Sequence, residues 1–506
     1  MDQHQQPMSL PRISIPKRVL SFIGHFIGYM FSSIGRYWYL TLVFSGIIII
    51  LSLCCGMTSA WLISGASLMA GILITIFAVN RELNKKYSGF NIAYYGCYTI
   101  RDGEYLTSDV DSDLLNNKVK ALSRKYINSQ TAFKDGYIKV HSVTLPKFLP
   151  LLFSYAKLDE YVKRQVQSQK HLATLYFLRD AGKQTITPVF HFDTDSFQNA
   201  YPVHYTERMI SELDEQPGKT VELGYMSFLL LFTTSLNSLM MESEEFQQVH
   251  NTLSETERLI FDIRASAHVF SEKGKEHIIR FSNYWEAYIN YMRVCVSMEQ
   301  REFFAAAQRV FKAIALNPFF PYESYETLKI EYSIRYALQL IPGIREYSQI
   351  TDPEKPIDLS DAEQKLSERI TYGATEYFYE LLNEILHRAN ETRISDYIEA
   401  ELAKLDGNNA FLLLTQSEVI RYIPKGEEKI NQIYAANIDK AIGLLKKAID
   451  TDKDFTILKS KLGSLLFVKG VHYANESIID EGAKLSVEGM FILQELGVIP
   501  VDSTNL

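Results

Sequence analysis

The hydrophobic pattern of the chain contains one long stretch without a charged side chain, between Arg36 and Arg81. A stretch of this length fits two membrane crossings of about 20 residues each, joined by a tight turn. We expect the first crossing over residues 38–55 and the second over residues 60–79, because glycine and small polar residues separate them. The pattern therefore predicts a two-helix transmembrane hairpin over residues 37–80.

The residues at the ends of this hairpin predict its orientation. Aromatic side chains mark the two membrane interfaces, and basic side chains are enriched on the cytosolic side of a membrane. The expected interface residues are Lys17, Arg18, Arg36, Trp38, Trp61, Arg81, Lys85 and Lys86. Since the basic residues flank both outer ends, both termini are expected in the cytosol, at the inner membrane of a bacterium. A cleaved signal peptide is the alternative, but the first apolar run starts too late for one.

Residues 1–36 form the predicted cytosolic N-terminus. Within them, apolar residues recur at steps of three and four between Lys17 and Arg36. This spacing predicts an amphipathic helix that lies in the membrane interface. Packing of the same helix against the soluble part of the chain is the alternative.

Residues 88–280 show a different pattern, which predicts a small α+β domain. Short β-branched runs predict strands over residues 137–143, 172–178 and 184–192. The last two runs are separated by a glycine-containing loop and form a predicted hairpin. Pro188 lies in the third run and should place that strand at the edge of a sheet, since proline cannot donate a ladder hydrogen bond.

Helical periodicity is found before and between these strands, over residues 116–126 and 158–169. A long apolar run follows at residues 225–241. Because this run contains several hydroxyl and amide side chains, we expect a buried core helix. A third membrane crossing is the alternative.

Residues 284–500 are predicted to be helical almost throughout. Predicted helices cover residues 301–317, 322–341, 361–390 and 396–405, with breaks at residues 342–358 and 424–432. Two segments resemble the tetratricopeptide repeat, in which small residues let paired helices pack closely. The residues that carry the resemblance are Ala306, Ala313 and Pro318 in the first segment and Ala441, Ala448 and Gly463 in the second. The resemblance implies a helical solenoid that binds protein partners, and a helical bundle without repeats is the alternative.

Charge is distributed unevenly along the chain. Residues 1–90 hold seven basic and two acidic residues, a formal charge of +5, whereas the whole chain carries −8 and the remainder therefore −13. A basic anchor suits an anionic membrane surface. An acidic body argues against nucleic acid as the main partner. The four cysteines show no disulfide framework or metal-binding spacing, which favours a reducing compartment.

The candidate chemistry lies at His191, Asp193 and Asp195. A histidine and two carboxylates at alternating positions would share one face of a strand, and these side chains could bind a metal ion or serve an enzyme. A strand end followed by a polar turn explains the same residues. The chain has no other motif typical of a catalytic residue set, and no cofactor is expected.

The sequence thus supports three functional hypotheses. The first is a membrane-anchored scaffold or adaptor that binds a protein partner through its repeat-like helices. The second is a two-helix membrane effector, which forms pores or perturbs the bilayer under control of its cytosolic domain, as in bacterial antiviral defence. The third is an enzyme with its site in residues 88–280. Small residues along the second crossing also allow homo-oligomers through the hairpin.

Overall fold

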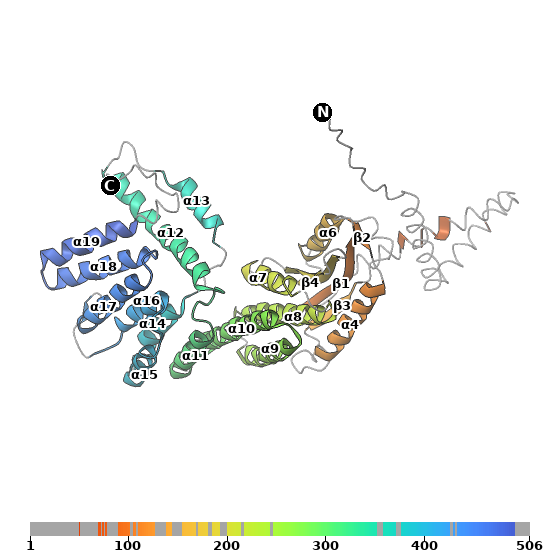
Figure 1. The fold of residues 1–506 in the computed structure, drawn as a ribbon, viewed down its shortest axis with the longest axis horizontal. Coiled ribbons are helices and arrows are strands. Elements are labelled where there is room, and N and C mark those ends of the chain that lie inside the picture. Colours follow the sequence, from red (N-terminus) through yellow and green to blue (C-terminus); the bar gives the residue numbers. More distant parts are fainter. Residues whose placement is uncertain are drawn as a thin grey trace, which may run out of the picture. The chain divides into compact units, whose positions relative to one another are not determined.

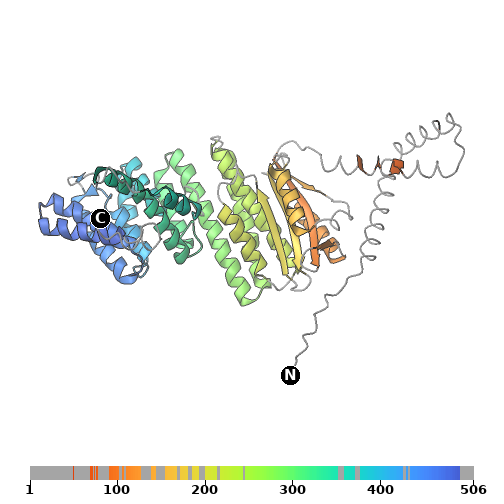
Figure 2. The same cartoon turned by 90° about the horizontal axis from the view of Figure 1, so that it is seen from above.

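The computed structural model describes residues 50, 69–71, 73–74, 76–77, 90–101, 105–107, 110–126, 138–143, 154–167, 171–180, 185–192, 200–213, 217–242, 246–351, 358–370, 376–425, 429–430 and 433–490. These residues are mostly helical with a small mixed sheet (Figures 1 and 2). They divide into two compact units. The first contains the described residues up to Phe192 together with Tyr205–Ser235, and the second contains residues 200–204 and those from Leu236 onward.

The first unit is built on a five-stranded sheet with the order β2-β1-β4-β5. Its strands are β1 (Phe90–Arg101), β2 (Tyr105–Thr107), β3 (Ile138–Ser142), β4 (Ala173–Asp180) and β5 (Thr185–Phe192). β3 and β4 pair with β1 in parallel, whereas β2 and β5 pair antiparallel with β1 and β4. The sheet is therefore mixed, with a parallel centre and an antiparallel edge at β5.

Helices cover both faces of this sheet (Figures 1 and 2). α6 (Tyr155–Gln167) packs Leu158 and Val162 against Tyr176 on one face. α4 (Val110–Tyr126) and α8 (Pro217–Glu242) cover the other face, where Gly224 lies against the Phe177 ring. A Cβ at position 224 would lie 2.8 Å from that ring, so only glycine allows this approach of helix and sheet.

β1 contains a β-bulge beside Gly96. Gly96 has a φ of 112°, a conformation that other residues rarely adopt, and the pairing with β4 shifts register between Tyr94 and Gly96. The Asn116 side chain accepts hydrogen bonds from the Cys97 amide at 2.9 Å and the Tyr94 hydroxyl at 2.7 Å. α4 is thereby fixed to the strand at the bulge.

The edge strand β5 is protected by α7 (Ala200–Ser211). The carboxylate of Glu207 accepts a hydrogen bond from the Phe190 amide at 2.7 Å. Pro188 removes a second donor from the same strand. These two residues leave fewer free donors for the pairing of another strand, which is a common protection of sheet edges.

The second unit consists almost entirely of helices, which Figure 1 labels along the chain. They are α9 (Phe246–Ser266), α10 (Glu272–Glu299), α11 (Phe303–Leu316), α12 (Tyr325–Thr351), α13 (Ser360–Glu368), α14 (Phe378–Ala389), α15 (Thr392–Leu402), α16 (Ala410–Ile420), α17 (Ala435–Thr451), α18 (Ile457–His472) and α19 (Glu476–Met490), with a short 3₁₀ turn η1 (Ala267–Val269). Two short strands, β6 (Lys429–Ile430) and β7 (Ile433–Tyr434), precede α17.

Several predictions from the sequence are confirmed. The strand hairpin is β4 and β5, and β5 with Pro188 lies at the edge of the sheet. The helices expected over residues 116–126 and 158–169 are α4 and α6. The apolar run at residues 225–241 belongs to α8, and its side chains from Tyr225 to Phe232 are buried.

Other expectations are wrong. β1, the central strand of the sheet, was not predicted, because both of its faces are covered and its residues show no simple alternation. The expected break at Pro342 is absent, since α12 continues to Thr351. Pro342 itself is exposed, whereas Ile344 is buried and Arg345 binds Glu363 of α13 at 2.6 Å. Packing beyond the proline therefore offsets the hydrogen bond that the proline removes.

The helix expected over residues 361–390 is two helices, α13 and α14. α14 has its own start, where the Glu380 carboxylate accepts a hydrogen bond from the Tyr377 amide at 2.9 Å. A glutamate at the third helical position that accepts a hydrogen bond from the amide of the N-cap residue is an N-terminal signal. The helix expected over residues 396–405 begins earlier and ends earlier, as α15.

The predicted membrane segments lie largely outside the described residues. Of residues 1–89, the structure describes helical backbone at Ile50, at Gly71 and at six further positions between Met69 and Phe77. Among the described residues, no helix is both long and apolar enough to cross a bilayer. The hairpin, the amphipathic helix and all eight interface residues from Lys17 to Lys86 remain predictions.

Candidate functional sites

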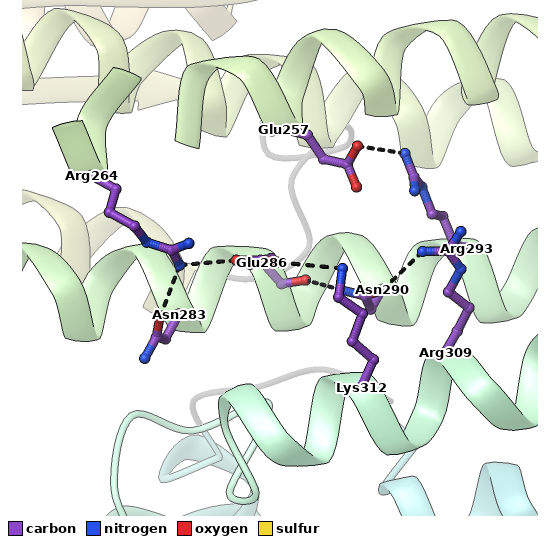
Figure 3. A network of polar contacts seen from close by, with 8 residues as sticks. All are labelled: Glu257, Arg264, Asn283, Glu286, Asn290, Arg293, Arg309 and Lys312. Carbon is purple, nitrogen blue, oxygen red and sulfur yellow. Dashed lines mark hydrogen bonds and ion pairs between the residues drawn. The ribbon is translucent and has the colours of Figure 1, made fainter. Parts of the chain in front are cut away.

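A network of charged side chains connects α9, α10 and α11 (Figure 3). Its centre is Glu286 of α10. One oxygen of Glu286 lies 2.9 Å from Nη2 of Arg264 in α9, and the other lies 3.4 Å from Nζ of Lys312 in α11. The same Nη2 of Arg264 donates a hydrogen bond to Asn283 at 2.9 Å. A single carboxylate therefore joins three helices.

A second part of this network lies one to two helical turns further along α10. Arg293 binds Glu257 of α9 at 2.8 Å, and Arg309 of α11 donates a long hydrogen bond of 3.4 Å to the Asn290 amide oxygen (Figure 3). Asn290 also donates to the backbone carbonyl of Glu286 at 2.8 Å. The α10 members at positions 283, 286, 290 and 293 are spaced by three, four and three residues, which places them on one helix face.

The network has a surplus of positive charge, with four basic side chains and two carboxylates. Among the described residues, Arg309 has no carboxylate within ion-pair distance, and Nε of Arg293 is buried without a hydrogen-bond partner. Burial lowers the pKa of Arg309, and the nearby positive charge of Arg293 lowers it further. The planar guanidinium groups of two adjacent arginines are suited to bind a carboxylate or a phosphate.

A second polar cluster lies in the first unit, between α6 and the sheet. Asp159 of α6 is its centre. Its Oδ1 atom lies 2.8 Å from Nε2 of His191 and accepts a hydrogen bond from the Tyr176 hydroxyl at 2.7 Å, while Oδ2 binds Lys163 at 2.9 Å. The ring of Tyr176 also lies beside the His191 ring, with centroids 6.0 Å apart.

Burial and neighbouring charges shift the pKa values in this cluster. Burial lowers the pKa of His191 below its usual value, and the attraction of Asp159 offsets only part of that effect. Burial alone would raise the pKa of Asp159, but hydrogen bonds from Lys163 and Tyr176 lower it. The cluster thus favours a neutral imidazole held by an ionised carboxylate, an arrangement that orients a general base or fixes α6 to the sheet.

Of the predicted metal site at His191, Asp193 and Asp195, the structure describes only His191. His191 is on β5 and binds Asp159, whereas Asp193 and Asp195 lie outside the described residues. Within the described ranges, no group of three or more histidine, cysteine, aspartate or glutamate side chains could hold a metal ion.

The residues of the expected repeats lie at helix contacts. Ala306 and Ala313 of α11 are fully buried, as are Ala441 and Ala448 of α17. Ser417 of α16 donates to the Ala441 carbonyl at 3.1 Å. Pro318 follows Asn317, the C-cap residue of α11, and Gly463 lies in the contact between α18 and α19. Small residues at these positions permit close packing but do not by themselves identify a repeat family.

The sequence analysis did not single out the network on α9, α10 and α11. The spacing of polar residues along α10 was a usable signal, because these residues recur at helical spacing within residues 281–298, where most other side chains are apolar and buried. The partners on α9 and α11 could not be paired with it, since a helical pattern does not tell which neighbour a face meets.

No protein-family model matches the chain, and comparisons with curated proteins and with solved structures find no significant match. The resemblance to tetratricopeptide repeats therefore stays a prediction from the sequence.

Proposed function

We propose that the chain is a membrane-anchored adaptor that binds a protein partner through its C-terminal helical unit. The anchor is the uncharged segment over residues 37–80. The partner contact is the surplus of positive charge on α10 and α11. The observation that carries the proposal is the pair Arg293 and Arg309. Arg293 binds Glu257 at 2.8 Å, whereas Arg309 has no carboxylate within ion-pair distance among the described residues.

Side chains near the end of the predicted hairpin support a lipid environment. Met69, Leu73, Ile76 and Phe77 each expose more than half of their surface, whereas Ala70 and Ile74 are buried. A helix that presents large apolar side chains outward is costly in water and favourable in a bilayer. This exposure supports a lipid environment for the segment, whereas the cytosolic location of both chain ends is argued from the basic residues that flank it.

The arginine pair supports recognition of an acidic surface on a partner protein. Two neighbouring cations repel one another, so a carboxylate from outside the chain would gain attraction from both and remove their mutual repulsion. The acidic balance of the remaining chain, −13 outside residues 1–90, makes non-specific attraction of anions elsewhere on the molecule weak. Binding would then be directed to this face.

The experiment compares the full-length chain with two charge-reversal variants, each expressed in the organism from which the protein comes and studied in its membranes. Arg309→Glu reverses the unpaired cation, and Glu at this position faces Arg293, which should preserve the fold. Arg280→Glu is the matched control, because Arg280 is an exposed residue of α10 that binds Glu276 outside the network. Chemical cross-linking followed by affinity purification identifies proteins bound to each variant.

We expect a protein that is captured by the unchanged chain and by Arg280→Glu, and whose capture falls at least ten-fold with Arg309→Glu. Identical captured proteins for all three variants would refute the role of the arginine pair. Recovery of the full-length chain in the supernatant after detergent-free ultracentrifugation would refute the membrane anchor.

A further inference from the structure

The charged network on α9, α10 and α11 carries an excess of two positive charges (Figure 3). It contains the basic residues Arg264, Arg293, Arg309 and Lys312 and the acidic residues Glu257 and Glu286. Both carboxylates already bind basic residues of the network, at distances between 2.8 and 3.4 Å. An anion with two negative charges would therefore balance the charge of these side chains.

The hydrogen-bond donors that remain for such an anion belong to Arg293 of α10 and Arg309 of α11. Arg293 binds Glu257 through Nη2, and its Nε is buried without a hydrogen-bond partner among the described residues. Arg309 donates from Nη1 to the Asn290 amide oxygen at 3.4 Å, which is a weak contact. Burial, and after it the charge of Arg293, lower the pKa of Arg309, so the two cations are close enough to repel each other.

A phosphate monoester suits these donors better than a carboxylate does. At pH 7 it carries a charge of about −1.5 to −2 and has three strong acceptor oxygens. A carboxylate has one negative charge and two oxygens. Each of the two planar guanidinium groups can bind a different oxygen of one phosphate, which removes their mutual repulsion. A single carboxylate would leave one of the two excess charges unbalanced.

The donors are recessed between the helices. The Arg293 side chain exposes 14% of its surface, and Asn290 is fully buried. A single group on a flexible chain can enter such a recess more readily than the flat surface of a bilayer can. An anionic bilayer would also be repelled by the acidic body of the chain, whose formal charge is −13 outside residues 1–90.

An exposed aromatic side chain lies on the same side of α9. Phe261 follows Glu257 by four residues and precedes Arg264 by three, which places these three side chains above one another on the helix. The Phe261 side chain is 69% exposed, and this apolar surface is available for contact with an apolar group of a ligand. A free phosphate or a lipid headgroup offers no such group, whereas a peptide does.

We propose that Arg293 and Arg309 bind a phosphorylated side chain of the partner protein, and that an apolar side chain of the same peptide packs against Phe261. This inference rests on the proposed adaptor function and names the chemical group that the adaptor recognises. Phosphorylation of the partner would then control its recruitment to the membrane.

The test measures binding of fluorescent peptide libraries to the full-length protein in detergent. The central residue is phosphoserine, phosphothreonine, phosphotyrosine, serine or glutamate, and the flanking positions are randomised. We expect at least one phosphorylated library to bind about ten-fold more tightly than the glutamate library, because two guanidinium groups bind the phosphate. Inorganic phosphate should compete with that library. Binding of the glutamate library as tight as that of every phosphorylated library would overturn the proposal.

Four variants test the residues of the site. Arg309→Glu should abolish the preference for phosphate, and Arg309→Lys, which keeps the charge but loses the planar fork, should weaken phosphopeptide binding by about five-fold. Phe261→Ala should weaken phosphopeptide binding by about three-fold and leave the inhibition constant of inorganic phosphate unchanged. Arg280→Glu is the matched control and should bind as the unchanged protein does, because Arg280 lies outside the network. A preference for phosphate that persists in a cooperatively melting Arg309→Glu would place the site elsewhere and overturn the proposal.

A flotation experiment tests a lipid as the source of the phosphate. The protein is reconstituted in phosphatidylcholine nanodiscs and mixed with vesicles of phosphatidylcholine and phosphatidic acid. We expect no flotation with the vesicles. Flotation that depends on Arg309, without a preference for any phosphorylated library, would replace the peptide by a lipid headgroup. Competition by inorganic phosphate without such a preference would leave a site for free phosphate only, and either result refutes the proposal.

The outcomes separate this proposal from the adaptor function. If no phosphorylated library is preferred but capture of a partner still depends on Arg309, the adaptor function stands and its ligand is a carboxylate. If phosphopeptides bind through Arg309 but the full-length chain does not sediment with membranes, the phosphate site stands and the membrane anchor is wrong.

Discussion

Gly463 of α18 lies directly against the backbone of Ser486 in α19. A Cβ at position 463 would meet the Ser486 amide nitrogen at 2.5 Å and the Gly482 carbonyl oxygen at 2.6 Å. Gly470 faces Ile479, and Gly482 faces Phe467, so residue numbers rise along one helix as they fall along the other. The two helices are therefore antiparallel and in backbone contact along their length.

This contact predicts that Gly463→Ala destabilises the protein. The methyl group meets backbone atoms, which cannot move away as a flexible side chain can, and overpacking of this kind costs about 1–3 kcal/mol. Chemical denaturation measures the free energy of unfolding. Gly443→Ala on α17 is the matched control, because its Cβ would meet nothing within 4 Å. The control should stabilise the protein by about 0.5–1 kcal/mol through better helix propensity, and equal effects of both changes would contradict the predicted role of the contact.

The contrast between these glycines shows what the sequence could and could not reveal. Gly463 was singled out because it follows Ala441 and Ala448 where the first helix of the next repeat-like unit would have a small residue. Nothing in the sequence distinguishes Gly463 from Gly443, since both lie in helices. The difference lies in which helix packs beside each residue, and that is decided by tertiary structure.

In the first unit, too, features set by local sequence could be predicted, whereas features set by tertiary contacts could not. β5 and its place at the sheet edge were predictable, because Pro188 cannot donate to a neighbouring strand. β1 was not, because a strand covered on both faces lacks alternation and its bulge at Gly96 shifts the pattern again. The contact of His191 with Asp159 joins a strand to a helix 32 residues earlier, which no local spacing encodes.

The network on α9, α10 and α11 predicts a larger effect for Glu286 than for an exposed glutamate of the same helix. Glu286→Gln removes the charge that holds Arg264 and Lys312, and should lower the free energy of unfolding by about 1–2 kcal/mol. Glu276→Gln is the matched control, because Glu276 forms an exposed ion pair with Arg280. Exposed pairs contribute about 0–1 kcal/mol, so the control should change stability by less than about 0.5 kcal/mol. A similar loss for both variants would show that Glu286 does not join the three helices.

The lowered pKa of the buried His191 side chain predicts that the stability of the protein depends on pH. Since burial lowers its pKa in the folded state, the unfolded chain takes up the proton at higher pH than the folded one does. The contribution of the neutral imidazole is therefore complete above about pH 6.5, the usual value for histidine, and is lost as the pH falls below it. The melting temperature of the unchanged protein should drop more between pH 7.5 and pH 5.5 than that of His191→Gln.

The control for this comparison is His268→Gln, a change at an exposed histidine of the turn η1. It should leave the drop in melting temperature as in the unchanged protein. If His191→Gln shows the full drop as well, His191 does not titrate with unfolding as its burial requires.

The contact of Asp452 with α12 should weaken in acid. The Asp452 carboxylate accepts a hydrogen bond from the Tyr325 hydroxyl at 2.6 Å and lies 3.0 Å from Nζ of Lys329. Burial alone would raise the pKa of Asp452, but hydrogen bonds from Tyr325 and Lys329 outweigh burial and lower it. A carboxylate with a lowered pKa stabilises the folded contact at neutral pH, and this contribution is lost as the pH falls from the usual aspartate value of about 3.9 through the lower value. Hydrogen exchange of α12 relative to α18, corrected for the intrinsic effect of pH, should therefore rise as the pH is lowered through this range. In Asp452→Asn, which removes the charge at every pH, α12 should already exchange faster at pH 7 and the ratio should no longer change with pH. A ratio that rises equally in both proteins would show that the acid-sensitive group is not Asp452.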